Sequence, residues 1–279
     1  MSFKTILVQI DESRHADARI ELASKIAAAE NAHLIGAAMT GVSRYLFEAM
    51  SVAPMDPDVM PYVETLRQRG YATLDKFEAA TRQFNVMSAE KRLIDDEPVA
   101  GVSLLARYCD LVVLGQTDRD DPAALGPLDL PESIVLQSGC PALIVPYATM
   151  VRTIAKKVLI AWNASLEAKH AVFYALPFLK KANVVHVAIF NPKPQSGDTD
   201  DPPEAALRHY LGRHGIDVEV SVETTKIDVG SAMLSLAATL DSDLIVMGCY
   251  GHSRFREVLT GGTTRTMLAS MTIPVLMAH

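Results

Sequence analysis

Three glycines near the end of the chain have the spacing of a phosphate-binding loop. Gly248, Gly251 and Gly261 form the pattern G-x2-G-x9-G, and a helical segment begins just after Gly262. Because glycine has no side chain, backbone N–H groups at such positions can approach an oxygen cluster closely. The start of a helix adds unpaired N–H groups and the positive end of its dipole, which favour an anion. The pattern predicts a phosphate site; the alternative is a turn that needs glycine for backbone reasons alone.

The elements that position this loop occur twice in the chain. Residues 6–13 match residues 158–165 at an offset of 152, and residues 110–115 match residues 243–248 at an offset of 133. Self-similarity of this kind indicates a duplicated domain. The two offsets differ by 19 residues, so the first half carries an insertion, which we place around residues 40–65.

Each copy of the first apolar run ends in a polar residue. Asp11 ends the first run and Asn163 ends the second, with Ser13 and Ser165 two places later. An amphipathic segment follows in both copies. We expect each serine to cap this helix by accepting a hydrogen bond from a free backbone N–H group.

Continuous apolar runs alternate with amphipathic segments along both halves, which is typical of a parallel sheet buried on both faces. We predict an α/β fold of two tandem doubly wound domains, each with a five-stranded parallel sheet. They comprise residues 1–147 and 156–279, joined by a linker over 148–155. The expected strands are 4–10, 32–39, 88–94, 110–115, 141–146, 156–162, 183–190, 217–225, 243–248 and 273–277. The expected helices are 14–30, 60–84, 98–108, 131–138, 165–180, 202–214, 230–240 and 263–270.

The composition favours a globular protein that binds neither nucleic acid nor a membrane. Of the 279 residues 49% are hydrophobic, and the net charge of -7 repels anionic partners. The beginning of the sequence has no signal-peptide pattern, and we expect a cytoplasmic protein. The three cysteines, Cys109, Cys140 and Cys249, lack the spacing of a metal site.

The glycine spacing, its strand–turn–helix setting and the Asx-x-Ser after the first strand resemble the universal stress protein family. The resemblance covers both halves and implies an adenine nucleotide alpha hydrolase-like fold. It also implies a stress-response protein that binds ATP or AMP, with or without Mg²⁺, in its second domain and acts as a regulatory or signalling module.

The same resemblance implies the residues of the site. The phosphates would lie at the glycine loop, and the base and ribose at the ends of the first two strands of the second domain. Two positions depart from the family pattern, because Asn163 replaces an Asp and Gly262 replaces a Ser or Thr. The implied phosphate residues are Gly248, Gly251, Gly261, Gly262, Thr263 and Thr264, and the implied base-side residues are Ala161, Asn163 and Val187. His252 flanks the glycines and is a further candidate for a phosphate contact.

The first half has lost most of the glycine pattern. Gly115 matches Gly248, but Asp118, Leu128 and Asp129 stand where the second half has glycine. Carboxylates repel phosphates, so we expect no equivalent nucleotide site in the first domain.

Two alternatives stay open. The protein could be a slow ATPase, although Glu257 and His252 are the only nearby candidates for a base and neither has a defined partner. It could instead be a scaffold or a carrier of an apolar ligand, which would use the first domain and its Met-rich insertion. A homodimer and an unknown protein partner also remain open.

Overall fold

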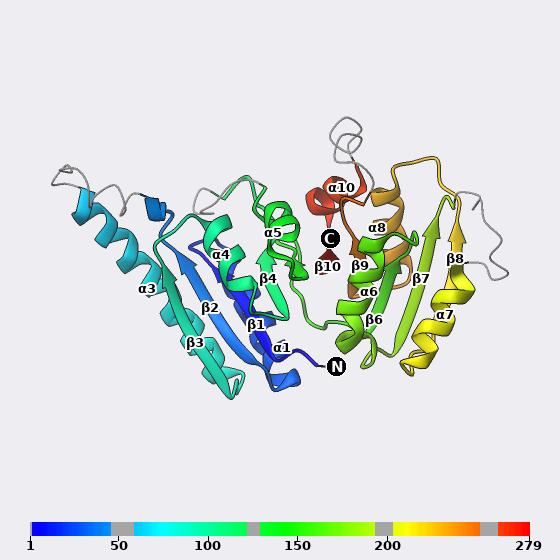
Figure 1. Cartoon of the computed structure of the whole chain (residues 1–279), viewed down its shortest axis with the longest axis horizontal. Coiled ribbons are helices and arrows are strands. Elements are labelled where there is room, and N and C mark those ends of the chain that lie inside the picture. Colours follow the sequence, from blue (N-terminus) through cyan, green and yellow to red (C-terminus); the bar gives the residue numbers. More distant parts are fainter. Residues whose placement is uncertain (1, 46–58, 122–128, 193–202, 252–261) are drawn as a thin grey trace. The chain divides into compact units, whose positions relative to one another are not determined.

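The computed structural model describes residues 2–45, 59–121, 129–192, 203–251 and 262–279 (Figure 1). The chain divides into two compact units, whose main segments are Phe3–Tyr147 and Ala148–His279. Each unit is an α/β domain with a parallel sheet, so the predicted fold is confirmed. Residues 46–58 of the predicted insertion, together with Leu128, His252, Glu257 and Gly261, lie outside the described residues.

The first unit has a five-stranded parallel sheet in the order β3-β2-β1-β4-β5. Helices α1 and α3 pack together against one face, and α4 packs with α5 on the other. The strands are β1 (Thr5–Ile10), β2 (His33–Met39), β3 (Ser88–Ile94), β4 (Leu111–Gly115) and β5 (Ala142–Val145). The helices are α1 (Ala16–Glu30), α3 (Val59–Gln83), α4 (Pro98–Ala106) and α5 (Leu130–Ser138).

The second unit repeats this order as β10-β9-β6-β7-β8. Helix α6 lies across β6, β9 and β10, and α8 packs with α10 on the other face (Figure 1). The strands are β6 (Lys157–Ala161), β7 (Val184–Phe190), β8 (Glu219–Glu223), β9 (Leu244–Gly248) and β10 (Val275–Ala278). The helices are α6 (Leu166–Leu179), α7 (Pro203–Arg213), α8 (Val229–Thr239) and α10 (Thr263–Ser270).

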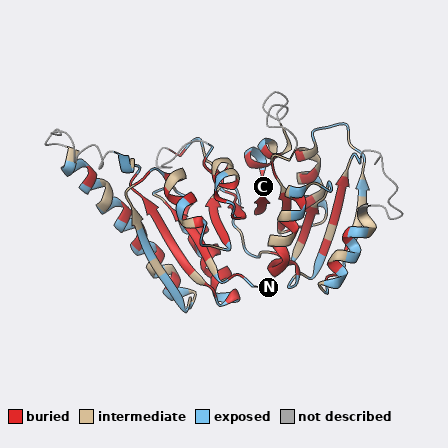
Figure 2. Cartoon of the chain, viewed as in Figure 1, coloured by how far each residue is buried: buried red, intermediate tan, exposed pale blue. Residues whose placement is uncertain are grey.

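Aliphatic side chains form the core of each unit, and the central strands are buried on both faces (Figure 2). Strand β1 contributes Ile6, Leu7 and Val8, while β6 contributes Leu159 and Ile160, all fully buried or nearly so. Burial on both faces explains why the strands appear in the sequence as continuous apolar runs rather than as an alternating pattern.

Part of the extra length of the first half lies in a helix. Helix α3 has 25 residues, whereas its counterpart α7 has 11. The prediction placed the insertion around residues 40–65, and α3 begins inside that range at Val59. None of the described helices is both long and apolar enough to span a membrane.

The two predicted helix caps have different outcomes. Ser165 is the N-cap of α6 and its side chain accepts a hydrogen bond from the Ala168 N–H at 3.1 Å. The prediction for Ser13 was wrong, because α1 begins only at Ala16 and its N-cap position is His15. The Ser13 hydroxyl donates to Asp11 instead. The Ser13 hydroxyl thus bonds to the Asp11 carboxylate instead of to a backbone N–H group at the start of α1.

Candidate functional site

The second unit has a pocket of about 260 Å³ where the carboxyl ends of its central strands meet two helix starts. Strand β6 lies between β9 and β7, so the strand order reverses at β6. Strands β7 and β8 lie on one side of β6, and the later strands β9 and β10 lie on the other. Ligands of doubly wound folds bind at such a switch point. The lining residues are Ala161, Trp162, Asn163, Ser165, Phe190, Val229, Met233, Met247, Gly248, Tyr250, Gly251, Thr263 and Thr264.

Six of the ten predicted site residues line this pocket, namely Ala161, Asn163, Gly248, Gly251, Thr263 and Thr264. Gly262 is the N-cap of α10, directly before Thr263, and no side chain of the described residues caps this helix. His252 and Gly261 are not described. Val187 is fully buried in the middle of β7 and does not line the pocket. Its neighbours in the sheet are Ile160 on β6 and Val220 on β8.

The two glycines of the loop that are described lie against the first turn of α6. A Cβ atom on Gly248 would overlap the backbone nitrogen of Ala168 and come within 2.5 Å of the Glu167 carbonyl carbon. A Cβ atom on Gly251 would lie 2.7 Å from Oε2 of Glu167. Gly248 therefore has a packing role in addition to any contact with a ligand, because only glycine lets α6 approach β9 this closely.

The turn after β6 is held by its own polar groups. The Oδ1 atom of Asn163 accepts a hydrogen bond from the Ser165 N–H at 3.1 Å, and Ser165 in turn caps α6. Between them Ala164 has a φ of 59°, in the left-handed region that non-glycine residues rarely occupy. Tyr250, in the loop after β9, also has a φ of 59°. Two strained residues in the two loops that border one pocket agree with a functional role for it.

Apolar side chains form the part of the pocket that the sequence reasoning missed. Trp162 follows the last residue of β6, Phe190 ends β7, and Met233 lies in the second turn of α8. Trp162 is the only tryptophan in the chain and stands next to Asn163, which was a signal in the sequence. Aromatic and thioether side chains pack well against the flat face of a nucleobase. None of the described lining residues carries a charge.

The equivalent region of the first unit contains a buried ion pair. The Arg19 guanidinium donates to Oδ1 of Asp11 at 2.9 Å and to the Gln9 carbonyl at 2.7 Å. The Arg19 side chain is 3% exposed and that of Asp11 is 10% exposed. Arg19 also occupies the space beside Gly115, where a Cβ atom would overlap its Nη1 atom.

The ionisation of Asp11 reflects two opposing effects. Burial of the carboxyl group disfavours the charged form, but the charge of Arg19 and hydrogen bonds from Ser13 and Gln9 outweigh it. The net result is that the pKa of Asp11 is held below its ordinary value. Asp11 is therefore an anion that is already neutralised by the protein.

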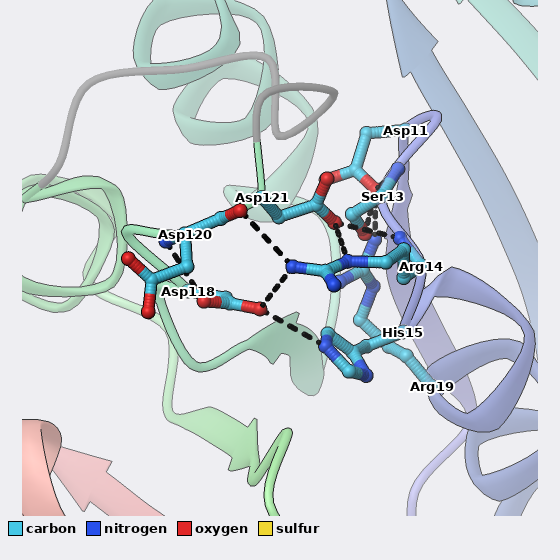
Figure 3. A network of polar contacts seen from close by, with 8 residues as sticks. All are labelled: Asp11, Ser13, Arg14, His15, Arg19, Asp118, Asp120 and Asp121. Carbon is cyan, nitrogen blue, oxygen red and sulfur yellow. Dashed lines mark hydrogen bonds and ion pairs between the residues drawn. The ribbon is translucent and has the colours of Figure 1, made fainter.

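A second set of contacts joins the loop after β4 to the loop after β1 (Figure 3). The side chain of Asp118 contacts His15 Nε2 at 3.1 Å and the Arg14 guanidinium at 3.3 Å. Asp121 accepts a hydrogen bond from the Arg14 N–H at 2.8 Å, and Asp120 accepts one from the Arg14 side chain through its carbonyl at 3.1 Å. Asp118, which replaces one glycine of the pattern, and Asp121 are thus paired within the unit.

Both halves of the chain match the model of one family. The matched segments are residues 2–146 and 155–279, and the model is that of the Universal stress protein family. The chain belongs to this family. Its universal stress protein domains therefore account for almost the whole length of the chain.

The sequence identity between this chain and individual universal stress proteins is moderate to low. Universal stress protein Slr1230 of Synechocystis sp. (strain ATCC 27184 / PCC 6803 / Kazusa) is 28% identical over 177 residues, which are 60% of this chain and 57% of that protein. The chain thus spans little more than half the length of this curated relative.

Two solved structures are similar to this chain over almost its full length. A universal stress protein from Archaeoglobus fulgidus DSM 4304 has a TM-score of 0.74 with 17% identity, covering 98% of this chain and 97% of its own. A second, from Pseudomonas aeruginosa UCBPP-PA14, has a TM-score of 0.62 with 20% identity, covering 99% and 93%. At these identities the similarity shows the fold and says nothing of a shared ligand.

Proposed function

We propose that this universal stress protein binds one adenine nucleotide, ATP or AMP, in the pocket of its second unit and acts as a regulatory module. The observation that carries the proposal is the composition of that pocket. The lining includes Trp162 and Phe190, which follow β6 and end β7, and Gly251, which follows β9 on the other side of β6, together with the start of α10. A nucleobase packs against apolar and aromatic side chains, and a phosphate needs hydrogen-bond donors.

Among the described residues, the phosphate end offers hydrogen-bond donors rather than positive side chains. Thr263 and Thr264 form the first turn of α10, whose N–H groups point toward the N-terminus of that helix, and their hydroxyls add two further donors. The helix dipole favours an anion there, typically by ~0.3–1 kcal/mol at an exposed site. Mg²⁺, if bound, would enter with the nucleotide phosphates.

The ligand class is that of two solved members of the family. One universal stress protein was solved in complex with cAMP, and one from Archaeoglobus fulgidus in complex with dAMP. These complexes describe those proteins, and the proposal for this chain rests on its own pocket. The proposal is for binding alone, because the described lining residues include no carboxylate or imidazole that could act as a base.

The test uses Trp162 as its reporter. Because Trp162 is the only tryptophan and lines the pocket, its fluorescence should change when an adenine ring packs against it. We expect a saturable change on titration with AMP or ATP. A titration without any change, together with no heat of binding by calorimetry, would refute the proposal.

Two variants make the test specific for the second unit. Gly251→Asp places a carboxylate at the position where the first unit has Asp118, and we expect it to weaken binding by at least about a hundredfold. Asp118→Asn changes the matching position of the first unit and should leave the titration unchanged. Equal effects of the two variants would contradict a site in the second unit.

A further inference from the structure

A carboxylate lies directly behind the phosphate end of the pocket. The Glu167 side chain places Oε2 2.7 Å and Cδ 3.2 Å from the position that a Cβ atom of Gly251 would occupy. Glu167 is half-buried in the first turn of α6 and is not among the lining residues, whereas Gly251 is. A negative charge therefore stands within a few ångströms of any anion bound to the Gly251 backbone.

The first unit shows how unusual this arrangement is. The residue that matches Glu167 is His15, and the residue that matches Gly251 is Asp118. His15 and Asp118 contact each other at 3.1 Å, so the same two positions hold groups of complementary character there. In the second unit Glu167 faces a glycine, and among the described residues it has no ion-pair partner.

The energetic consequence depends on the charge of the ligand. A carboxylate and a phosphate a few ångströms apart repel each other, and the repulsion increases with each further phosphate group. The start of α10 and its two threonines attract one anionic group. These described groups provide about half a positive charge, which is less than the additional charge of a triphosphate.

We propose that Glu167 sets the phosphate charge that the site accepts, so that the pocket takes an adenine nucleotide with one phosphate group in preference to ATP. This inference rests on the proposed function. Glu167 acts here as a specificity-determining residue through its charge, and its removal leaves the apolar end of the pocket unchanged.

The experiment compares AMP with ATP in the presence of EDTA, with Trp162 fluorescence as the readout. We expect wild-type protein to bind AMP on the order of tenfold more tightly than ATP. Glu167→Gln keeps the shape of the side chain and removes its charge. It should reduce this preference by about tenfold, mainly through tighter binding of ATP.

The control is Glu204→Gln, which removes the same charge from the first turn of α7. Glu204 does not line the pocket, so the preference for AMP should be retained. Equal binding of AMP and ATP by the wild type, or a preference that Glu167→Gln leaves intact, would overturn the inference while nucleotide binding stands. If neither nucleotide binds any of the proteins, the proposed function itself fails and the inference with it.

Discussion

In the first unit the loop after β4 presents Asp118 to His15, whereas in the second unit the loop after β9 presents Gly251 to Glu167. The two sheets have the same strand order, and the two loops lie at the same place in it. What differs is the contacts of the polar groups. In the first unit Asp118 and His15 contact each other, and in the second unit Gly251 lines a pocket.

This comparison shows that two copies of one domain can keep the same fold while different polar groups occupy the same place in it. The guanidinium of Arg19 lies beside Gly115 and neutralises Asp11, so the first unit holds a buried cation and anion paired with each other at this position. The matching residue of the second unit is Ala171, which has no polar side chain to fill the space. The difference involves few residues in each unit, and single substitutions can therefore test it.

The largest expected effect is the loss of the buried ion pair. Asp11→Ala leaves the guanidinium of Arg19 buried without its anion, and we expect a loss of about 3–5 kcal/mol in the free energy of unfolding. The matched control is Asn163→Ala, which removes one exposed hydrogen bond and should cost less than about 1 kcal/mol. Urea denaturation followed by circular dichroism measures both. Similar losses in the two variants would contradict the contrast between the units.

The next effect concerns the packing of α6. Gly248→Ala forces a Cβ atom against the backbone of Ala168 and Glu167, and we expect a loss of about 1–3 kcal/mol because a helix must shift. Gly212→Ala on α7 meets no atom within 4 Å and should be neutral or stabilising by up to about 0.5 kcal/mol. Thermal unfolding of the two variants distinguishes them. A Gly248→Ala protein as stable as the wild type would show that the close approach is not needed.

The ion pair also predicts a pH dependence that the matching position of the second unit, Asn163, lacks. Because the pKa of Asp11 is lowered in the folded state, its contribution to stability is present above the unfolded-state value and is lost as the pH falls below about 4. Asn163 does not titrate. Unfolding measured from about pH 6 to about pH 3 should therefore show a smaller acid-induced loss in Asp11→Asn than in the wild type. Parallel pH profiles for the two proteins would argue against the pair.

The smallest expected effect is that a glycine substitution stabilises one turn and destabilises the matching turn of the other unit. Ala164 has a φ of 59°, and Ala164→Gly should stabilise the protein by about 0.5 kcal/mol because glycine adopts this conformation without strain. Glu12 matches it in the first unit and does not have a positive φ, so Glu12→Gly should destabilise by a similar amount through the greater entropy of the unfolded chain. The same sign for both changes would contradict the different turn geometries.

The order of the elements was predictable because it depends on local patterns. Apolar runs such as residues 6–10 and 158–160 mark buried strands, and the observed strands lie within one or two residues of the predicted ranges. The N-cap at Ser165 was predictable for the same reason. Ser13 was mispredicted because its hydroxyl is held by Asp11, whose charge is itself fixed by Arg19 on the following helix. The sequence repeat alone does not reveal the contact between Arg19 and Asp11.

The candidate site was predictable only in its polar part. The glycine spacing identified Gly248 and Gly251, but the neighbour of both is α6, and the distance between a helix and a strand has no sequence signal. Val187 was predicted from the family resemblance, which implies a backbone contact late in this strand, whereas the pocket opens at the end of the strand, where Phe190 lies. Trp162 was missed because apolar residues at a strand end have the same appearance as core residues.

The central claim is that one chain holds one adenine nucleotide, in the second unit. Native mass spectrometry of the full chain with AMP counts the nucleotides directly. We expect one AMP per chain for the wild type and for Asp118→Asn, and none for Gly251→Asp. Two nucleotides per wild-type chain, or one that Gly251→Asp retains, would contradict the claim.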